Sequence, residues 1–598
     1  MPNGIEGLVG WAFGIPIGLG LFQGEAWHPL RGLRGERRIE PSWFGRVDLI
    51  AVLDYPSAMS LRGTGTGGAI SRAVEAFQVL NGAGFLSLGF LRSLRAAQDK
   101  FGSSSASGFY ASALREPSSV AIIDDVGQLT YGELDRSTNA IARGLTEAGV
   151  KAGDGVALFA RNHRGFVQAQ MALDKLGANV LLLNTGFAAP QLEEVCKREG
   201  SQVILYDEEF RGIVEAGEAR KLTRFVTFSE DGATEKTLDD LAAAHDDSDV
   251  EPPAKPGRVT ILTSGTTGTP KGAQRAIARP GIDTLVGLFG RLPLARGKRV
   301  LVAAPTFHSW GGLHLLLGAQ LGSTVILQRR FEPEATLAAI QEHRPEVLIV
   351  VPVMMQRILE LDADVISRYD TSSLEGVCAS GSALPGDLAL RWMDTFGDNV
   401  YNLYGSTEVA HASIAMPDEL RAAPGTAGRP PRGVIVKILD DEGREVEKGA
   451  TGRIFVANDT QFDGYTGGGN KEIIEGLMSS GDVGHFDDDG RLFIDGRDDD
   501  MIISGGENVF PREVEDLLSD HTDVAEASVL GVSDDEFGQR LKAFVVLKAG
   551  IAPNESALKD HVKVNLARYK VPRDIVFLET LPRNPTGKVL KRVLLEEH

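Results

Sequence analysis

Cysteine is scarce in this chain: among 598 residues there are only two, Cys196 and Cys378. Two thiols cannot build a disulfide framework, and they fall short of the ligand set of a structural zinc site. The chain also lacks the Gly-x-Ser-x-Gly pentapeptide, which argues against a hydrolase with a nucleophile elbow. A reducing, cytoplasmic location fits this composition.

Positive charge and long apolar runs are also in short supply. Lys and Arg total 62 against 82 Asp and Glu, so the formal net charge is −20. A chain this acidic has no general footprint for nucleic acid, although a local basic pocket can still bind an anion. The first apolar run, Trp11–Phe22, is shorter than the ~20 residues of a spanning helix. No Lys or Arg precedes it, which argues against a secretory signal.

Glycine, in contrast, is abundant, at 70 of 598 residues against a usual share of about 7%. There is no collagen-like period, so we expect many tight turns and loops that approach a ligand closely. The 42% of apolar residues is typical of a globular protein, and the length predicts roughly two to four domains.

The N-terminal part, residues 1–105, shows no regular alternation of strands and helices and is interpreted as an extension. It runs into Gly102–Gly108, whose composition predicts a flexible linker. The apolar segment Phe85–Arg95 favours a helix packed on the main body, with an interfacial helix on a membrane surface as the alternative. Gly63–Gly68 matches a dinucleotide fingerprint, but no strand ends there and no acidic residue follows at the required distance.

From about residue 106, short apolar strands alternate with helical segments, which predicts a parallel α/β sheet. Thr130–Glu133 is a capping box that opens a helix. The apolar face of this helix holds Leu134, Ile141, Leu145 and Ala148. Further strands are predicted at 120–123, 156–159, 180–183, 203–206 and 259–262, and helices at 166–176 and 191–197. The acidic, Pro-rich stretch 230–257 is predicted to be a surface excursion, and beyond Gly496 strands at 527–530 and 543–547 predict a separate small α+β domain.

The strongest local signal is Thr263–Gly272, TSGTTGTPKG, directly after a predicted strand. Its glycines let backbone N–H groups converge on an anion, its hydroxyls add donors, and Lys271 adds a positive charge. Gly265 and Lys271 are spaced as in a Walker loop, but Pro270 and Gly272 replace residues which that motif needs. The segment therefore predicts a triphosphate-binding loop of another kind.

With this loop, the sequence resembles the adenylate-forming superfamily, specifically the acyl-CoA synthetases, over about residues 110–598. The further matching motifs follow in order as Tyr404–Glu408, Ser480–Asp482 with Gly496–Arg497, Arg497–Asn508, and Pro582–Lys588. The resemblance implies an α/β fold with a large adenylation domain at 106–498, built of mixed, largely parallel sheets packed with helices. A small, mobile α+β domain at 499–598 would carry the catalytic lysine.

By the same resemblance, one group of residues would bind ATP and AMP. They are Thr263, Ser264, Gly265, Thr266, Thr267, Gly268, Lys271, Gly381, Ser382, Tyr404, Gly405, Asp482 and Arg497. Glu408 would hold Mg²⁺, because a carboxylate beside a triphosphate suits that ion. Thr407 would bond the α-phosphate, and Asp482 would bind the ribose hydroxyls.

The C-terminal motifs supply the remaining catalytic parts in this interpretation. Lys588 matches the adenylation lysine, a cation that lowers the cost of bringing a carboxylate to the α-phosphate. Asp499 matches the hinge between the two domains. Gly505 and Gly506 would pass close to the pantetheine arm of coenzyme A, where the lack of a Cβ suits close approach.

The resemblance also implies that the acyl group binds near Phe307–Gly312, where His308 would act as a gate and catalytic group. Trp310, Gly311 and Gly312 would line the acyl pocket. No Asp occurs in this segment, which disfavours amino-acid substrates. A medium- or long-chain fatty acid is the favoured substrate, with aryl or sterol side-chain acids as alternatives.

The implied function is an ATP-dependent acyl-CoA synthetase that forms acyl-AMP and then the CoA thioester, with ATP, Mg²⁺ and coenzyme A as cofactors. One rival passes the acyl group to a carrier protein; Gly505–Gly506 and Arg568–Pro572 favour the CoA branch. A non-catalytic nucleotide-binding regulator is disfavoured, since both Lys588 and Glu408 are present. No nucleic-acid partner is expected, while a homodimer and a peripheral membrane contact of the N-terminal segment stay open.

Overall fold

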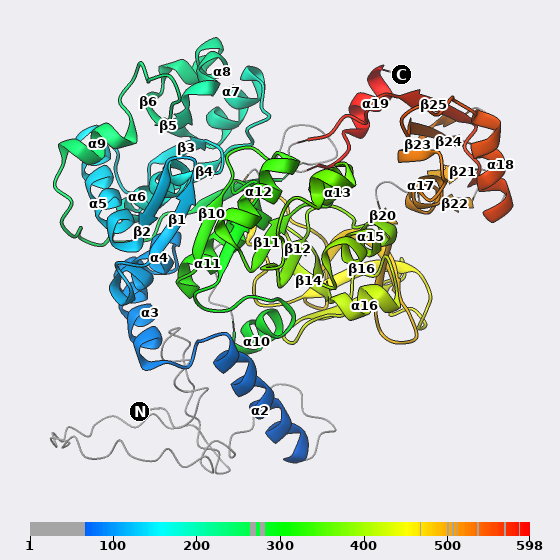
Figure 1. Ribbon diagram of the computed structural model, residues 1–598, viewed down its shortest axis with the longest axis horizontal. Coiled ribbons are helices and arrows are strands. Elements are labelled where there is room, and N and C mark those ends of the chain that lie inside the picture. Colours follow the sequence, from blue (N-terminus) through cyan, green and yellow to red (C-terminus); the bar gives the residue numbers. More distant parts are fainter. Residues whose placement is uncertain are drawn as a thin grey trace.

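The computed structural model describes residues 66–598 except 264–270, 276–280, 467, 499–501, 505–506, 510, 535–537, 567–569, 585–586 and 598. Within this part, the strands form two large parallel-rich sheets, a smaller antiparallel sheet and a C-terminal sheet. Figure 1 shows the C-terminal sheet and its helices as a separate lobe beside the large body of the molecule. This arrangement confirms the predicted α/β fold with a large and a small domain.

The first large sheet has the strand order β14-β13-β12-β11-β9-β10-β1-β2, parallel throughout except for the antiparallel edge strands β2 and β14. Its strands are β1 Val120–Asp124, β2 Gly127–Thr130, β9 Arg299–Val302, β10 Thr324–Leu327, β11 Val347–Val350, β12 Gly376–Ala379, β13 Val400–Ser406 and β14 Ala410–Ala415. The central strands β11 and β12 are buried along their whole length, as continuous apolar runs covered on both faces should be.

The second large sheet follows the order β17-β8-β7-β4-β3-β5-β6, with parallel pairing from β7 to β6 and antiparallel pairing at β8 and β17. Its strands are β3 Gly155–Phe159, β4 Asn179–Leu182, β5 Ser201–Asp207, β6 Thr223–Phe228, β7 Val259–Thr263, β8 Lys271–Arg275 and β17 Gly464–Tyr465. The strands predicted at 156–159, 180–183, 203–206 and 259–262 are thus confirmed within a residue or two, as is that at 120–123.

Two smaller sheets complete the molecule. The antiparallel one contains β15 Ile435–Leu439, β16 Gly452–Ala457, β18 Ile473–Ile474, β19 Leu477–Phe486 and β20 Leu492–Arg497. The C-terminal one contains β21 Ile502–Ser504, β22 Glu507–Val509, β23 Val524–Asp534, β24 Gly538–Leu547 and β25 Asp574–Leu578. The latter has its own apolar core, so the small domain is stabilised independently of the large one.

The helices pack against these sheets. In the large domain they are α2 Thr66–Gly82, α3 Leu88–Phe101, α4 Ser105–Arg115, α5 Tyr131–Glu147, α6 Arg164–Leu176, α7 Ala189–Arg198, α8 Arg211–Ala216, α9 Leu238–Ala244, α10 Ile282–Arg291, α11 Ser309–Leu321, α12 Pro333–His343, α13 Pro352–Leu359, α14 Ala363–Ile366, α15 Gly386–Phe396 and α16 Pro417–Ala422. In the small domain they are α17 Pro511–Ser519, α18 Glu555–Asn565 and α19 Lys591–Glu597. None of the helices among the described residues is both long and apolar enough to cross a membrane.

The predicted capping box at the start of α5 is confirmed: Thr130 accepts from the Glu133 amide, and the Glu133 carboxylate accepts from the Thr130 amide. Leu134, Ile141 and Leu145 are buried as predicted, whereas Ala148 lies past the end of the helix and is exposed. The prediction that residues 230–257 form a surface excursion is partly wrong, since α9 lies within this stretch and buries Leu238 and Leu241.

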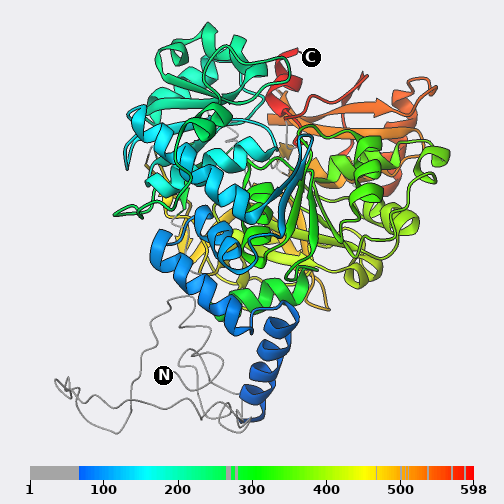
Figure 2. The same cartoon turned by 60° about the vertical axis from the view of Figure 1, so that its left-hand side comes forward.

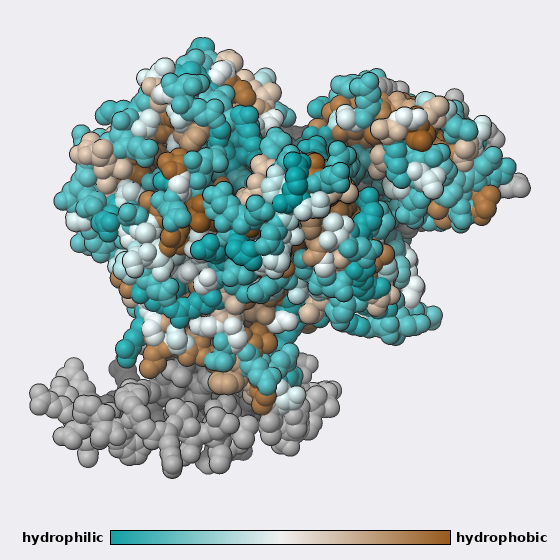
Figure 3. All heavy atoms as spheres, in the orientation of Figure 1, coloured by the Kyte–Doolittle hydropathy of each residue, from teal (hydrophilic) through white to brown (hydrophobic). Residues whose placement is uncertain are grey.

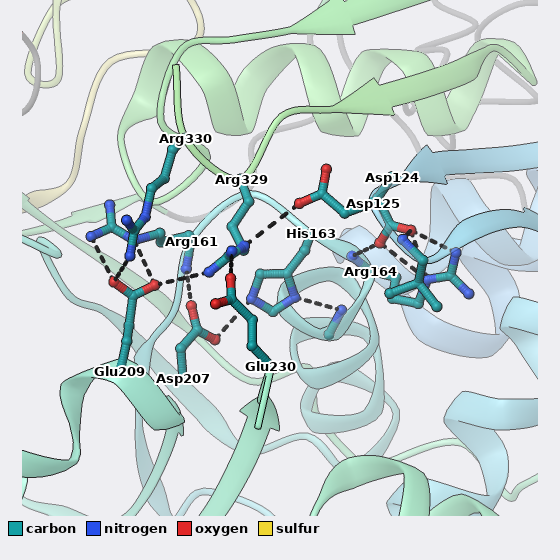
Figure 4. A network of polar contacts seen from close by, with 12 residues as sticks. Asp124, Asp125, Arg161, His163, Arg164, Asp207, Glu209, Glu230, Arg329 and Arg330 are labelled. Atoms are coloured by element: carbon teal, nitrogen blue, oxygen red, sulfur yellow. Dashed lines mark hydrogen bonds and ion pairs between the residues drawn. The ribbon is translucent and has the colours of Figure 1, made fainter. Parts of the chain in front are cut away.

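A charged network joins the two large sheets (Figure 4). The Arg164 guanidinium, at the start of α6, lies 2.6 Å from the Asp124 carboxylate at the end of β1. Arg329 and Arg330, just after β10, both donate to Glu209, just after β5. The pair of Arg164 with Asp124 is largely buried, whereas Arg330 is 56% exposed; together these ion pairs connect the two sheets at this point.

The N-terminal helices correct the predicted linker. Figures 1 and 2 show α2, α3 and α4 at the end of the large domain away from the small one. Within the supposed linker Gly102–Gly108, Ser105 begins α4, and its side chain is buried. Ser112 of α4 donates to the carbonyl oxygen of Ala319 in α11 at 2.6 Å. Serine-rich composition here reflects close helix packing, not flexibility.

The apolar segment Phe85–Arg95 also packs on the main body, which agrees with the favoured prediction for this segment. Phe90, Leu91 and Leu94 of α3 lie in the large core, so that face is not available to a membrane. Val74 and Phe77 of α2 remain 47% and 42% exposed. Figure 3 shows apolar side chains at this lower end of the described molecule. A membrane contact of the N-terminal part and the boundary at residue 105 stay predictions.

One buried carboxyl secures α4. Asp174, on α6, is 2% exposed and accepts hydrogen bonds from the Ser105 hydroxyl and from the Ala106 amide. Burial raises the pKa of Asp174 from 3.8 to about 6, although these hydrogen bonds act in the opposite direction. Desolvation therefore outweighs the donors at the start of the helix.

This pKa shift predicts a pH-dependent stability. Because the folded-state pKa of Asp174 is raised, its contribution is fully present below about pH 4 and is lost as the pH rises through about 6. Relative to Asp174→Asn, which stays neutral, the wild type should lose about 2 kcal/mol of unfolding free energy between pH 4 and pH 7. Urea denaturation across this range measures the difference; Asp560→Asn, at an exposed position in α18, is the control. A difference that does not change with pH would contradict the assignment.

Candidate active site

The two ends of the predicted phosphate loop are held by a pair of antiparallel strands. Thr263 ends β7 and lies opposite Lys271, which begins β8. Ser264, Gly265, Thr266, Thr267 and Gly268 lie outside the described residues. Gly272, the residue after Lys271, has no room for a side chain, because a Cβ there would lie 2.6 Å from the Thr466 hydroxyl. The strand pair therefore closes the loop tightly at its base.

A second turn, between β13 and β14, carries Thr407 and Glu408. Its backbone is compressed: a Cβ on Gly405 would lie 2.0 Å from the carbonyl oxygen of Ala410. Ala410 itself has a φ of 61°, an unfavourable conformation for a residue with a side chain. The Ser406 hydroxyl accepts from the amides of Glu408 and Val409. Glycine is thus required at 405 to form the turn that presents Glu408.

Tyr465 connects the two turns, and sequence reasoning missed it. Its hydroxyl donates to Glu408 Oε1 at 2.8 Å, and the Lys271 ammonium lies 5.3 Å from the centre of its ring. Tyr465 is in β17, which pairs with β8. It lies 57 positions from Glu408 along the chain and belongs to none of the motifs, so only the tertiary structure reveals the contact.

Glu408 fits the role of a magnesium ligand. Its side chain is nearly buried, and the hydrogen bond from Tyr465 leaves the other carboxylate oxygen for a cation. No cluster of three or more His, Cys, Asp or Glu suited to a metal exists among the described residues. Mg²⁺ commonly binds one or two carboxylates together with substrate phosphates and water, so this donor set agrees with magnesium brought in by a nucleotide.

Tyr404, Asp482 and Arg497, which are predicted to bind the nucleotide, meet in the structure. The Tyr404 hydroxyl donates to Asp482 Oδ2 at 2.5 Å, and Arg497 Nη1 lies 3.4 Å from Asp482 Oδ1. Asp482 and Arg497 lie opposite each other on β19 and β20. Burial raises the pKa of Asp482, while the positive charges of Arg497, Lys471 and Lys588 oppose that shift. Burial and the neighbouring Asp482 raise the pKa of Tyr404 well above its usual value, so Tyr404 remains a donor.

Lys588 is brought to this cluster from the other domain. Its amide donates to Asn584 Oδ1 at 2.9 Å, and the Gly587 amide donates to the Asn584 carbonyl oxygen. Gly587 has a φ of 81°, and a Cβ there would lie 2.4 Å from Val353 Cγ1 on α13. The loop thus rests directly on the large domain, and Lys588 is one of the positive charges that oppose the raised pKa of Asp482.

The predicted acyl-binding segment forms the start of α11. Trp310 is buried and its indole N–H donates to the Val350 carbonyl oxygen at 2.9 Å. A Cβ on Gly311 would lie 2.4 Å from the Pro305 carbonyl oxygen, so helix packing alone explains this glycine. A Cβ on Gly312 would lie 3.0 Å from the Thr306 carbonyl oxygen. Whether these residues line an acyl pocket stays a prediction.

His308 occupies the N-cap position of the same helix, α11, without a capping hydrogen bond from its side chain. Its Nε2 atom is buried and has no hydrogen-bond partner among the described residues. Burial lowers the pKa of His308 to about 4, so the ring is neutral at physiological pH. The hydroxyls of Ser309 and Thr407 are 3.5 Å apart, which places this segment beside the Glu408 turn.

Other predicted residues are located only in part. Gly381 lies in the turn after β12 with a φ of 90°, and Ser382 follows it, half-buried. Asp499, Gly505 and Gly506 lie outside the described residues, so their predicted roles are not addressed by this geometry.

Comparison with known proteins agrees with this arrangement. Residues 109–466 match the family described as AMP-binding enzyme, and residues 513–588 match its C-terminal domain. The chain belongs to the AMP-binding enzyme family. The predicted resemblance to adenylate-forming enzymes is therefore confirmed, as is the predicted class of AMP-forming acid–thiol ligases that use ATP and coenzyme A, with Mg²⁺ typical of the family.

Similar proteins of this family differ in the acid they use. The chain is 34% identical over 481 residues to a feruloyl-CoA synthase of Amycolatopsis sp, covering 79% of this chain and 95% of that protein. It is 30% identical over 501 residues to the fatty acid–[acyl-carrier-protein] ligase ScoC of Streptomyces coeruleorubidus, covering 81% and 94%. An anthranilate CoA ligase bound to anthranoyl-AMP superposes with a TM-score of 0.75 at 25% identity, covering 83% and 97%.

The compressed turn before Glu408 gives a direct test of the site in this AMP-binding enzyme. Gly405→Ala places a Cβ against backbone that cannot move aside, so we expect a loss of about 1–3 kcal/mol in stability. Nucleotide binding should weaken as well, because the turn carries Glu408. Urea denaturation and ATP titration measure the two effects.

The matched control is Gly89→Ala, since a Cβ at Gly89 in α3 meets nothing within 4 Å. This variant should retain ATP binding and stay within about 1 kcal/mol of the wild type. If Gly405→Ala behaves like Gly89→Ala, the turn is not constrained as described.

Proposed function

We propose that this protein activates a carboxylic acid with ATP and transfers the acyl group to the thiol of coenzyme A. The observation that supports this best is the docking of the Lys588 loop on α13, where Gly587 lies against Val353; Lys588 is also among the positive charges that oppose the raised pKa of Asp482. Asp482 is bonded to Tyr404, and Tyr404 is four positions before Glu408. In this proposal the Lys588 loop of the small domain supplies one cation to a nucleotide site built by the large domain.

In the first half-reaction, a carboxylate oxygen of the substrate attacks the α-phosphorus of ATP, and the bond to the bridging oxygen of the β-phosphate breaks. Acyl-AMP and pyrophosphate result. Lys588 stabilises the approach of two anions, Asp482 accepts from the ribose hydroxyls, and Thr407 donates to the α-phosphate. The phosphate loop with Lys271 holds the leaving pyrophosphate.

Magnesium completes the charge balance in this scheme. When bound, Mg²⁺ offsets the charge that develops on the leaving phosphates. Glu408 would hold the ion, and Tyr465 orients the Glu408 carboxylate through its hydrogen bond.

In the second half-reaction, the thiol of coenzyme A loses its proton and its sulfur attacks the acyl carbon, while the bond from that carbon to the AMP oxygen breaks. We propose that the small domain turns about Asp499 between the two steps, so that Gly505 and Gly506 come beside the pantetheine arm. Such rigid-body motion is a common way to present two catalytic faces to one site.

The proposed acid is a medium- or long-chain fatty acid, with aryl and sterol side-chain acids as alternatives. The apolar α11 supports an apolar acyl group: Trp310 and Leu315 are buried there. Since packing explains Gly311, this glycine no longer argues for a deep pocket. One similar protein is a feruloyl-CoA synthase and another is a fatty acid–[acyl-carrier-protein] ligase. For this reason both aryl and alkyl acids are tested as substrates.

Lys588→Ala should slow acyl-AMP formation about 100- to 1,000-fold, the usual effect of removing one preorganised electrostatic group. Transfer of the acyl group from supplied acyl-AMP to coenzyme A should stay near the wild-type rate, because Lys588 serves only the first step. Pyrophosphate release and thioester formation measure the two halves separately.

The control is Lys563→Ala, which removes an exposed lysine of α18 in the same domain and should change neither half-reaction. Equal losses in both half-reactions for Lys588→Ala would refute its assigned role.

Substrate and acceptor are decided by one screen. Fatty acids of increasing length, aryl acids and sterol side-chain acids are compared by acid-dependent pyrophosphate release, with coenzyme A present and absent. We expect fatty acids to be turned over fastest and coenzyme A to be consumed stoichiometrically. Thioester formed only on an added acyl carrier protein would show that the acceptor is a carrier protein, and faster turnover of aryl acids would overturn the fatty-acid assignment.

A further inference from the structure

The loop that presents Lys588 is held by a guanidinium from its own first turn. Arg583 Nη1 donates to the Gly587 carbonyl oxygen at 2.6 Å. That carbonyl belongs to the peptide unit that leads into Lys588, so the hydrogen bond fixes the backbone directly before the catalytic side chain. Arg583 also makes a β-bridge with Val589, which closes the loop from its other end.

The second arm of the same guanidinium is engaged by Glu526, on β23 of the small domain. Arg583 Nη2 lies 2.8 Å from Glu526 Oε2. The two side chains are 22% and 21% exposed, so the pair is partly shielded from water and from screening by salt. A guanidinium fits this double task because its donors lie in one rigid fork.

Glu526 also reaches across the domain boundary. Its other oxygen, Oε1, accepts from Gln356 Nε2 of α13 at 3.3 Å. Gln356 follows Val353, the residue that Gly587 contacts, by one turn of the same helix. A small cleft beside this contact is lined by Met354 and Arg357 of α13 and by Arg583 and Asn584 of the loop.

We propose that Arg583 and Glu526 are positioning residues for acyl-AMP formation: they hold the Gly587 carbonyl and, through Gln356, dock the Lys588 loop on α13. This proposal rests on the proposed function. Arg583 and Glu526 both belong to the small domain and move together when it turns. The bond from Gln356 crosses the boundary and must break for the second half-reaction, so it contributes only while Lys588 is in place.

The test separates the two half-reactions. Arg583→Met should lower the rate constant for acyl-AMP formation about 10- to 100-fold, because a displacement of about 1 Å in a catalytic group has an effect of this size. KM values for ATP and acid should stay within about threefold, and acyl transfer from supplied acyl-AMP to coenzyme A should stay within about twofold. Arg583→Lys keeps the charge but cannot bond both partners, and should fall between Arg583→Met and the wild type. Glu526→Gln should also be intermediate, since the neutral amide no longer forms the ion pair.

A double variant distinguishes positioning from a general structural role. If Arg583 acts through Lys588, then Arg583→Met combined with Lys588→Ala should form acyl-AMP no more slowly than Lys588→Ala alone. Gln356→Ala should slow acyl-AMP formation only about two- to threefold and leave acyl transfer unchanged. Matched controls are Arg592→Met and Glu555→Gln, which remove exposed partners of the i,i+4 pairs with Glu596 and Lys559; both should behave as the wild type.

The unfolding temperature of each variant is measured alongside. If Arg583→Met unfolds at a much lower temperature, Arg583→Lys and Glu526→Gln carry the test. Equal losses in both half-reactions, or a further loss in the double variant, would overturn the proposal while leaving the proposed function intact. Failure of the wild type to release pyrophosphate with any acid would instead overturn the proposed function.

Discussion

The contact between Gly587 and Val353 is the constraint on which the composite active site depends. A Cβ at residue 587 would approach Val353 Cγ1 to 2.4 Å, so the backbone of the small domain comes as near to α13 as glycine allows. Lys588 is among the positive charges that oppose the raised pKa of Asp482, which the large domain carries on β19. In the proposed reaction the large domain supplies the nucleotide contacts and the small domain the cation, so both domains are needed.

In the rest of the site, strained backbone and shielded charged groups both hold side chains in fixed positions. The turn that carries Glu408 contains Ala410 at a positive φ and requires glycine at 405. Such strain persists only where surrounding structure imposes it, and here the pairing of β13 with β14 does so. Tyr465 then ties this turn to the strand pair that closes the phosphate loop. The result is a set of groups held in place before any ligand arrives, as electrostatic stabilisation requires.

The N-terminal helices illustrate how composition can mislead. Ser104, Ser105 and Ser107 form part of a serine-rich stretch that predicts a linker, yet all three are buried where α4 meets its neighbours. Small polar residues suit flexible chain, but they equally suit close helix contacts, because they take up little space and one of them, Ser105, donates to the buried Asp174 carboxylate. Only the position of α6 distinguishes the two cases, and that position is not encoded in the local pattern.

The sequence by itself determined the alternation of strands and helices, the capping box at Thr130 and the family; the phosphate loop stays a prediction, because residues 264–270 lie outside the described part of the chain. Each of these features has a local signal. Apolar periodicity marks strands and helices, a hydrogen bond between residues three apart marks the capping box, and short motifs mark the family. The tertiary structure decided that Tyr465 contacts Glu408, that packing explains Gly311, and that Glu526 links Arg583 to Gln356. The contacts of Tyr465 with Glu408 and of Glu526 with Gln356 join positions 57 and 170 residues apart, and the packing of strands and helices, not the spacing along the chain, brings them together.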